Sequence, residues 1–206
     1  MDKTKLEKIN KLVNELKVID YNIKDIKTDT NFIKIKEGKY KLANGEIIRR
    51  ESVVKTNGCS DAVAMLAITE ENEILLVIQP RVALPTKTKI DIEIPAGYIE
   101  KGEKDIEAAN RELLEETGYQ AENLICIDEY YPSLGYSSEK ISIILATNCK
   151  KISNQKLDKD EYIRCIKVTV DEFKYLLDNR YILDATARLA YYKALEYSSN
   201  NNLLIS

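Results

Sequence analysis

The sequence contains no histidine among its 206 residues. Neither a Ser-His-Asp nor a Cys-His catalytic arrangement can therefore be built, and no histidine is present to act as a general base or a metal ligand. Any metal site in this chain must use oxygen ligands or thiolates. Oxygen ligands suit hard cations such as Mg²⁺, Mn²⁺ or Ca²⁺. If the chain is an enzyme, we expect carboxylates and a hard cation to carry its chemistry.

Cysteine is scarce, and long hydrophobic runs are missing. The four cysteines are widely spaced and form no C-x-x-C pair: Cys59, Cys126, Cys149 and Cys165. This spacing favours free thiols in a reducing cytosol over a zinc site or a disulfide framework. No apolar run approaches the roughly 18–20 residues that span a bilayer, and the charged N-terminus does not resemble a secretory signal. We expect a cytoplasmic protein that does not bind membranes.

An excess of positive charge is also missing. The chain has 31 Lys and Arg against 34 Asp and Glu, a formal net charge of −3. This balance argues against a protein that coats nucleic acid, so we expect no nucleic acid partner. A hydrophobic content of 44% suffices for a real core, and the length suits one domain with a modest extension.

Hydrophobic periodicity predicts a mixed α/β domain behind an N-terminal extension. Residues 1–17 have the spacing of an amphipathic helix, and the strand-like pattern of residues 18–56 contains an Asn-Gly turn. We assign 1–56 to the extension and 57–206 to the main domain. The main domain is expected to contain two core strands within 61–80, a strand at 90–94, a helix at 103–117, strands near 121–131, 139–148 and 162–169, and helices at 170–179 and 184–199.

The predicted helix at 103–117 has an apolar stripe with three carboxylates at its edge. At 100° per residue, the stripe consists of Ile106, Ala109, Leu113 and Thr117. The three carboxylates converge beside it, on Glu112, Glu115 and Glu116. Like charges at this spacing repel by about a few tenths of a kcal/mol, and a divalent cation reverses the sign of that interaction. Arg111 stands four residues from both Glu107 and Glu115, so we expect it to bridge them. Helix geometry alone is compatible with both a metal site and a solvated acidic face.

The stretch GYIEKGEKDIEAANRELLEETGY, residues 97–119, also resembles the Nudix hydrolase signature G-x5-E-x7-R-E-U-x-E-E-x-G-U, where U is a bulky aliphatic residue. Its positions are occupied by Gly97, Glu103, Arg111, Glu112, Leu113, Glu115, Glu116 and Gly118, followed by the aromatic Tyr119. The first eight positions would match by chance in fewer than roughly one in a million chains. The resemblance implies a Nudix-type α/β/α sandwich around a mixed β-sheet, here with an N-terminal helix and β-hairpin extension.

The same resemblance implies an activity and a cofactor. Nudix hydrolases cleave a nucleoside diphosphate linked to another group, with Mg²⁺ or Mn²⁺ held by the helix carboxylates. Carried over position by position, the implied metal ligands are Glu112, Glu116, Glu115 and the backbone carbonyl of Ala96. Arg111 and Glu103 would orient these ligands from outside the metal shell.

Residues 40–195 further resemble the ADP-ribose pyrophosphatase branch of that family. The shared features are the runs NGEIIRRESV (44–53), QPR (79–81), EIPAG (93–97), YPSLGYSSEK (131–140) and DATA (184–187). The resemblance implies that Arg50, Arg81 and Glu93 bind substrate, with Arg50 reaching across a homodimer interface. ADP-ribose would give AMP and ribose 5-phosphate. The general base would be Glu139 by resemblance, or Glu115 because it already lies at the carboxylate patch.

Some departures from the branch leave the substrate open. Leu134 stands where the branch usually has proline, and Tyr136 lies near the tyrosine position of dinucleoside polyphosphate hydrolases. The loop RVALPTKTKID, residues 81–91, is also longer than usual. A Nudix hydrolase of another diphosphate, such as a dinucleoside polyphosphate, is therefore an alternative. A non-catalytic nucleotide-sugar sensor is another, although such proteins are expected to lose signature residues that this chain keeps.

Overall fold

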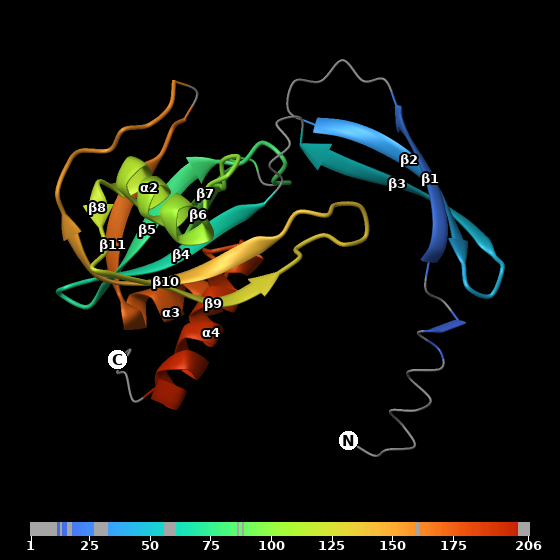
Figure 1. The fold of residues 1–206 in the computed structure, drawn as a ribbon. Coiled ribbons are helices and arrows are strands. Elements are labelled where there is room, and N and C mark those ends of the chain that lie inside the picture. The colour runs from blue at the N-terminus through green and yellow to red at the C-terminus, as the bar shows by residue number, and fades with distance from the viewer. Residues whose placement is uncertain are drawn as a thin grey trace. The chain divides into compact units, whose positions relative to one another are not determined.

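The computed structural model describes residues 12, 14–15, 18–26, 33–55, 61–85, 87, 89–159 and 161–201. These residues belong to two compact units (Figure 1). Residues up to 60, with 133–139, make up the first unit, and 61–132 with 140–206 make up the second. The predicted helix over residues 1–17 lies outside the described residues, apart from residues 12, 14 and 15. The roles assigned to 1–56 and 57–206 stay a prediction.

The first unit is a three-stranded antiparallel sheet in the order β1-β2-β3. Its strands are β1 (Val18–Ile26), β2 (Ile33–Leu42) and β3 (Ile47–Lys55). The predicted Asn-Gly turn joins β2 to β3: Asn44 Oδ1 accepts the N–H of Glu46 at 3.0 Å, and Gly45 adopts a φ of 93°. The hairpin is therefore confirmed, and β1 adds a third strand to it. The segment 133–139 joins this sheet through the N–H of Val53, which donates to the Tyr136 carbonyl at 2.7 Å.

The second unit contains a mixed sheet in the order β11-β5-β4-β10-β8, with β6 on β5, β7 on β4 and β9 on β10. Its strands are β4 (Ala62–Thr69), β5 (Glu73–Pro80), β6 (Ile90–Glu93), β7 (Ala96–Tyr98), β8 (Tyr119–Gln120), β9 (Asn123–Tyr130), β10 (Ile141–Lys151) and β11 (Arg164–Thr169). β4 and β10 run parallel, and the other pairs are antiparallel. All strands predicted for the main domain are confirmed.

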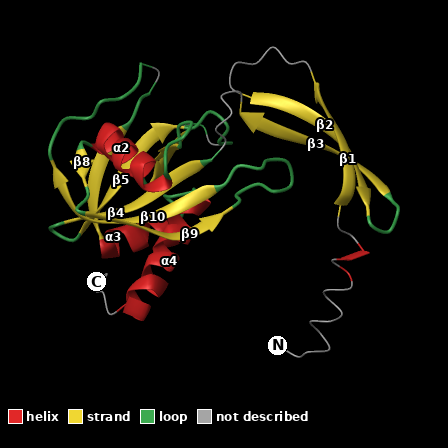
Figure 2. Cartoon of the chain, in the orientation of Figure 1, coloured by secondary structure: helices red, strands yellow, loops and turns green. Residues whose placement is uncertain are grey.

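Helices cover both faces of this sheet (Figures 1 and 2). They are α2 (Asp105–Thr117), α3 (Val170–Asp178) and α4 (Ala185–Asn201). Alternate side chains of β4 point to opposite faces: Met65 packs with Leu113 of α2, whereas Leu66 belongs to the core with Phe173 of α3 and Ala190 of α4. β4 is consequently buried along its whole length. The predicted α/β/α sandwich around a mixed sheet is confirmed.

The buried face of α2 differs in phase from the predicted stripe. Ala109, Leu113 and Thr117 are buried as expected, but Ile106 is 38% exposed and Ala108 is fully buried in its place. The small alanines at 108 and 109 let the helix approach the sheet closely. This orientation also brings Glu116, only 3% exposed, into the interior.

Two predictions from composition can be compared with the structure. Cys126, Cys149 and Cys165 are free thiols, as expected, and Cys59 lies outside the described residues. Among the described residues, no helix is long and apolar enough to cross a membrane. The cytoplasmic location stays a prediction.

Candidate active site

The loop before α2 and the first turn of the helix are tied together by hydrogen bonds. Gly102 adopts a φ of 88°, and the Glu107 side chain reaches back to accept the N–H of Lys104 at 3.0 Å. This contact satisfies a donor that the helix itself leaves unpaired. The expectation that Arg111 bridges Glu107 is therefore wrong, because the carboxylate caps the helix instead.

Arg111 organises the acidic face of α2. Its guanidinium holds both oxygens of Glu103, at 2.9 and 2.8 Å, and also donates to Glu112 at 2.7 Å and Glu115 at 3.2 Å. A further bond, at 2.9 Å, goes to the backbone carbonyl of Tyr98 on β7. The hydrogen bonds from Arg111 hold the pKa of the Glu103 carboxyl below its usual range, against the effect of burial. One side chain thus links the loop, the helix and the sheet, and its role in orienting metal ligands stays a prediction.

Glu116 carries the most perturbed carboxyl group of this patch. Its Oε2 accepts the N–H of Ala96 at 3.0 Å. Burial raises the pKa of Glu116 to about 8, against the effect of the Ala96 hydrogen bond, and the negative charges of Glu112, Glu161 and Glu93 raise it further. The pKa of Glu112 is also raised, chiefly by burial and against the effect of Arg111. Ionising both carboxyl groups is therefore energetically costly in the protein alone.

The two outer glycines of the signature have a steric explanation. A Cβ at Gly97 would lie 1.9 Å from the Glu112 carboxyl carbon, so only glycine lets this carboxylate rest against β7. Gly118 ends α2 with a φ of 74°, and a Cβ there would lie 2.2 Å from the Ser153 carbonyl oxygen. Both positions allow close approach of other atoms, which any side chain would prevent.

Two of the predicted substrate-binding residues lie together at the neighbouring strands β5 and β6. Arg81 grips Glu93 with two hydrogen bonds of 2.6 Å, and Gln79 donates to the same carboxylate at 3.2 Å. The pairing raises the pKa of Arg81, to which the Glu116 charge also contributes. Arg81 is about half exposed, whereas the Glu93 side chain is buried. The arginine is thus held by a buried anchor while part of its surface faces solvent.

The third predicted substrate-binding residue, Arg50, and the predicted general base, Glu139, belong to the first unit. Arg50 is exposed on β3 and donates to the Arg49 carbonyl at 2.8 Å. Glu139 is partly buried and forms an ion pair with Lys55 of β3. Neither contact tests a role in substrate binding or proton transfer, so both assignments stay predictions.

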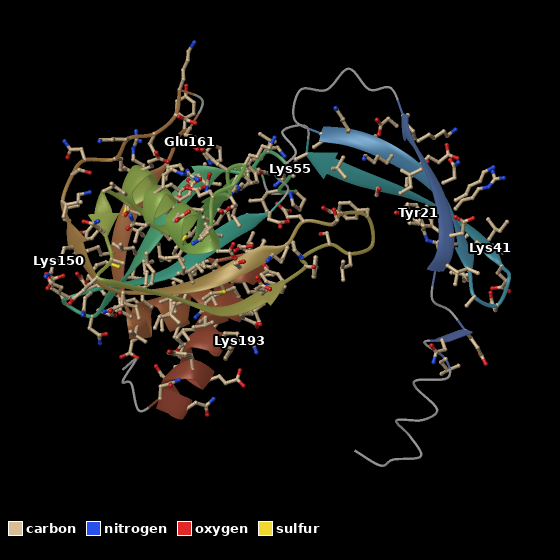
Figure 3. The ribbon with its side chains drawn as sticks, viewed as in Figure 1. Tyr21, Lys41, Lys55, Lys150, Glu161 and Lys193 are labelled. Atoms are coloured by element: carbon tan, nitrogen blue, oxygen red, sulfur yellow. The ribbon has the colours of Figure 1, made fainter. Side chains whose placement is uncertain are left out.

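Glu161 was not among the predicted site residues, and it lies between the strands predicted near 139–148 and 162–169. Its negative charge is among the causes that raise the pKa of both Glu112 and Glu116. The residue precedes β11, on the loop beside α2 (Figure 3). The only available signal was a glutamate at the end of a charged run before a strand. That pattern is equally typical of a solvated loop.

The chemistry of these side chains fits a hard divalent cation. Carboxylate and carbonyl oxygens are the ligands that Mg²⁺ and Mn²⁺ prefer, and a cation would relieve the burial cost at Glu116. In this conformation Arg111 engages Glu112 and Glu115. Within the described ranges, no group of three or more His, Cys, Asp or Glu side chains is arranged to hold a metal ion. Arg111 occupies one oxygen each of Glu112 and Glu115, so metal binding through all three glutamates would require their side chains to turn their remaining oxygens towards one point.

Comparisons with known proteins agree with this geometry. Residues 60–187 match the NUDIX domain family. The chain is 36% identical over 175 residues to an ADP-ribose pyrophosphatase of Bacillus subtilis, which covers 84% of this chain and 83% of that protein. It is 37% identical over 172 residues to a methanol dehydrogenase activator of Bacillus methanolicus, which covers 81% of this chain and 89% of that protein. The solved structure of an ADP compounds hydrolase matches the fold with a TM-score of 0.76, over 92% of this chain and 97% of that one, at 21% identity.

Proposed function

The chain belongs to the Nudix family and is a pyrophosphohydrolase, and from this premise we propose that it hydrolyses the pyrophosphate bond of ADP-ribose or a related nucleoside diphosphate sugar with Mg²⁺ as its cofactor. The observation that carries the proposal is the buried carboxyl of Glu116 at the Ala96 N–H, whose pKa is raised to about 8 by burial and by the charges of Glu112 and Glu161. Perturbed carboxyl groups of this kind are typical of functional sites. The likeness to an ADP-ribose pyrophosphatase at 36% identity supports the substrate class.

The ligands of the cation would be Glu112, Glu115, Glu116 and the backbone carbonyl of Ala96. A divalent cation at this place neutralises diphosphate charge and lowers the pKa of a bound water. Arg111 would remain on Glu103 and so keep the ligands oriented from outside. Mn²⁺ has the same ligand preferences and is expected to substitute.

Arg81 and Glu93 would recognise the substrate beside this patch. The guanidinium of Arg81 matches the geometry of phosphate oxygens, and its bidentate anchor on Glu93 limits the orientations that it can adopt. Because Arg81 is half exposed, donors remain accessible to a ligand. Glu93 itself would accept hydrogen bonds from the nucleoside or sugar. Arg50 would add a contact from the partner of a homodimer.

Three glutamates are candidates to take the proton from the attacking water. Glu139 is the first by resemblance, and Glu115 lies on α2 among the proposed metal ligands. Glu161 is the third candidate, because its negative charge contributes to the raised pKa of both Glu112 and Glu116. A base must reach the water that it activates, and a glutamine at the correct position would remove the acceptor without changing the shape.

We also propose that the first unit mediates homodimerisation. Several of its apolar side chains are exposed within one chain, including Tyr21 at 65% and Ile47 at 65%. Burial of such side chains against a second copy would lower the free energy of association. Light scattering that gives the mass of one chain at working concentration would contradict this assembly.

The activity is tested by a screen of diphosphate compounds with Mg²⁺ and product identification. ADP-ribose is expected to give AMP and ribose 5-phosphate. Faster cleavage of a dinucleoside polyphosphate would favour the alternative substrate class. Binding of ADP-ribose without turnover of any compound in the screen would contradict the proposed reaction.

A second candidate function is the activation of a dehydrogenase. It is favoured by the 37% identity to a methanol dehydrogenase activator over 89% of that protein. The test is to measure methanol oxidation by a methanol dehydrogenase with and without this chain. A Glu116→Gln variant serves as the control, since it separates an effect that needs the hydrolase site from one that needs only contact.

A further inference from the structure

One chain segment, Lys151–Lys156, covers the C-terminal end of α2, and we call it the capping segment. The last carbonyl groups of a helix have no partner within the helix. Here each of the last carbonyl groups accepts a hydrogen bond from the capping segment. The Glu115 carbonyl accepts the Lys156 N–H at 2.8 Å, and the Glu116 carbonyl accepts Gln155 Nε2 at 2.5 Å. The Thr117 carbonyl accepts Lys151 Nζ at 2.5 Å, and the Gly118 carbonyl accepts the Ile152 and Ser153 N–H groups at 3.0 and 3.1 Å. The close fit explains why a Cβ at Gly118 would collide with Ser153.

The Gln155 side chain connects the C-terminal end of α2 to the residue that precedes β11. Its amide nitrogen donates to the Glu116 carbonyl and, at 3.5 Å, to the carbonyl of Ile163. Ile163 is only 2% exposed and directly precedes β11. The Gln155 amide therefore bridges the metal-binding helix and the end of the loop that starts at the capping segment.

Glu161 lies between these two anchors, two residues before Ile163. Its own Oε2 accepts the N–H of Asp158 at 3.0 Å, so its carboxylate is held by a local turn of the loop. The loop that carries it lies against α2, because the Lys156 N–H donates to the Glu115 carbonyl at 2.8 Å. The negative charge of Glu161 contributes to the raised pKa of Glu112 and Glu116. The position of that turn relative to α2 depends on how the base of the loop is closed, and Gln155 is the side chain that closes it.

We propose that Gln155 is a positioning residue, which holds the loop that carries Glu161 against the C-terminal end of α2, the helix that carries Glu112 and Glu116. The inference rests on the proposed function, because it takes this patch as the active site. Gln155 has both of the required properties: an uncharged amide with two donor hydrogens and the length to reach a helix carbonyl and a loop carbonyl together. An acidic side chain would bring only acceptors to two carbonyl oxygens.

The first measurement does not depend on activity. Gln155→Met keeps the length of the side chain and removes its donors. Amide hydrogen exchange of peptides that cover 151–163 is expected to be about 10-fold faster in this variant, because a lost hydrogen bond of ordinary strength changes local opening by about that factor. Gln120→Met is the matched control, since Gln120 is exposed on β8, and it should leave this exchange unchanged. Unaltered exchange in Gln155→Met would overturn the inference whatever the substrate is.

The second measurement asks whether Gln155 acts through Glu161. Gln155→Met is expected to lower kcat for ADP-ribose about 10- to 100-fold, the usual effect of losing an orienting contact, with KM changed by less than about 2-fold. In a Glu161→Gln background the same substitution should have less than about 2-fold further effect on kcat, because residues that act as one unit are not additive. An equal loss in both backgrounds, or full turnover in Glu161→Gln alone, would overturn the inference.

A third readout keeps failure of the inference distinct from failure of the proposed function. The Mn²⁺ concentration at the midpoint of thermal stabilisation should rise at least about 10-fold in Gln155→Met and stay unchanged in Gln120→Met. If the wild-type chain does not cleave ADP-ribose, the proposed function fails, and exchange with Mn²⁺ stabilisation still decides the role of Gln155. Should Gln155→Met not fold, Gln155→Asn carries the same test, because its amide is one carbon too short to bridge both carbonyls.

Discussion

Replacing Glu116 by glutamine should stabilise the metal-free protein and abolish its response to divalent cations. The carboxyl has an ordinary pKa of 4.5 in the unfolded chain and a pKa of about 8 in the folded one, owing to burial and to neighbouring negative charge. At pH 7 the carboxyl is therefore ionised in the unfolded chain and mostly protonated in the folded one. The interval of about 2.5 pH units between 4.5 and 7, at about 1.4 kcal/mol for each unit, favours unfolding by roughly 3 kcal/mol. Glutamine does not ionise and can still accept the Ala96 N–H.

The sign of this effect gives a pH dependence. Because the folded state binds the extra proton, the contribution of Glu116 to stability is full below pH 4.5 and is lost as pH rises through about 8. At pH 7 in EDTA, Glu116→Gln should therefore unfold at a higher temperature, by up to about 10 °C for a chain of this size. This advantage should shrink towards pH 4.5.

Thermal unfolding in EDTA between pH 5 and 8.5, repeated with Mg²⁺ and Mn²⁺, measures both consequences. The wild-type Tm should rise when the cations are added, and the Tm of Glu116→Gln should not. Glu100→Gln is the control, because Glu100 is exposed and should behave like wild type. The reasoning would be refuted if Glu116→Gln were no more stable than wild type in EDTA. It would also be refuted if the Tm difference between the two proteins stayed the same from pH 5 to pH 8.5.

Three further predictions test other parts of the site. Gly97→Ala should lower kcat/KM for ADP-ribose about 100-fold, since a Cβ at 1.9 Å displaces the Glu112 carboxyl; activity within 2-fold of wild type would contradict the steric argument. Arg111→Lys should raise the Mn²⁺ midpoint of thermal stabilisation about 10- to 100-fold, because lysine cannot hold both oxygens of Glu103 while it contacts the helix carboxylates; an unchanged midpoint would speak against its orienting role. Among Glu139→Gln, Glu115→Gln and Glu161→Gln, the general base should show a kcat lowered about 10²- to 10⁴-fold, measured at saturating substrate and metal, and any candidate with unchanged kcat is eliminated.

The fold was predictable because its signals are local. The unbroken apolar run of β4 and β5, the Asn-Gly turn and the spacing within α2 each depend on residues close in sequence. Which face of α2 is buried could not be predicted in the same way. A helical wheel identifies a stripe but does not show how closely the helix approaches the sheet, so it included Ile106 and missed Ala108.

The candidate site was predictable only where one element supplies it. The signature spacing identified Arg111 and the helix carboxylates, although Arg111 binds Glu103 from the preceding loop rather than Glu107. Glu161 comes from a separate loop, and no spacing in one sequence relates it to α2. The bridge made by Gln155 depends in the same way on tertiary contacts.

The Arg111 contacts have a consequence for chain length. Arg111 binds Glu103, which precedes the helix, and the Tyr98 carbonyl on β7 at the same time. Both contacts form only if the number of residues between these partners is kept. Inserting one residue would turn the rest of the helix by about 100° and carry the guanidinium away from both. The intervening positions can therefore drift in sequence far more freely than they can be lengthened or shortened.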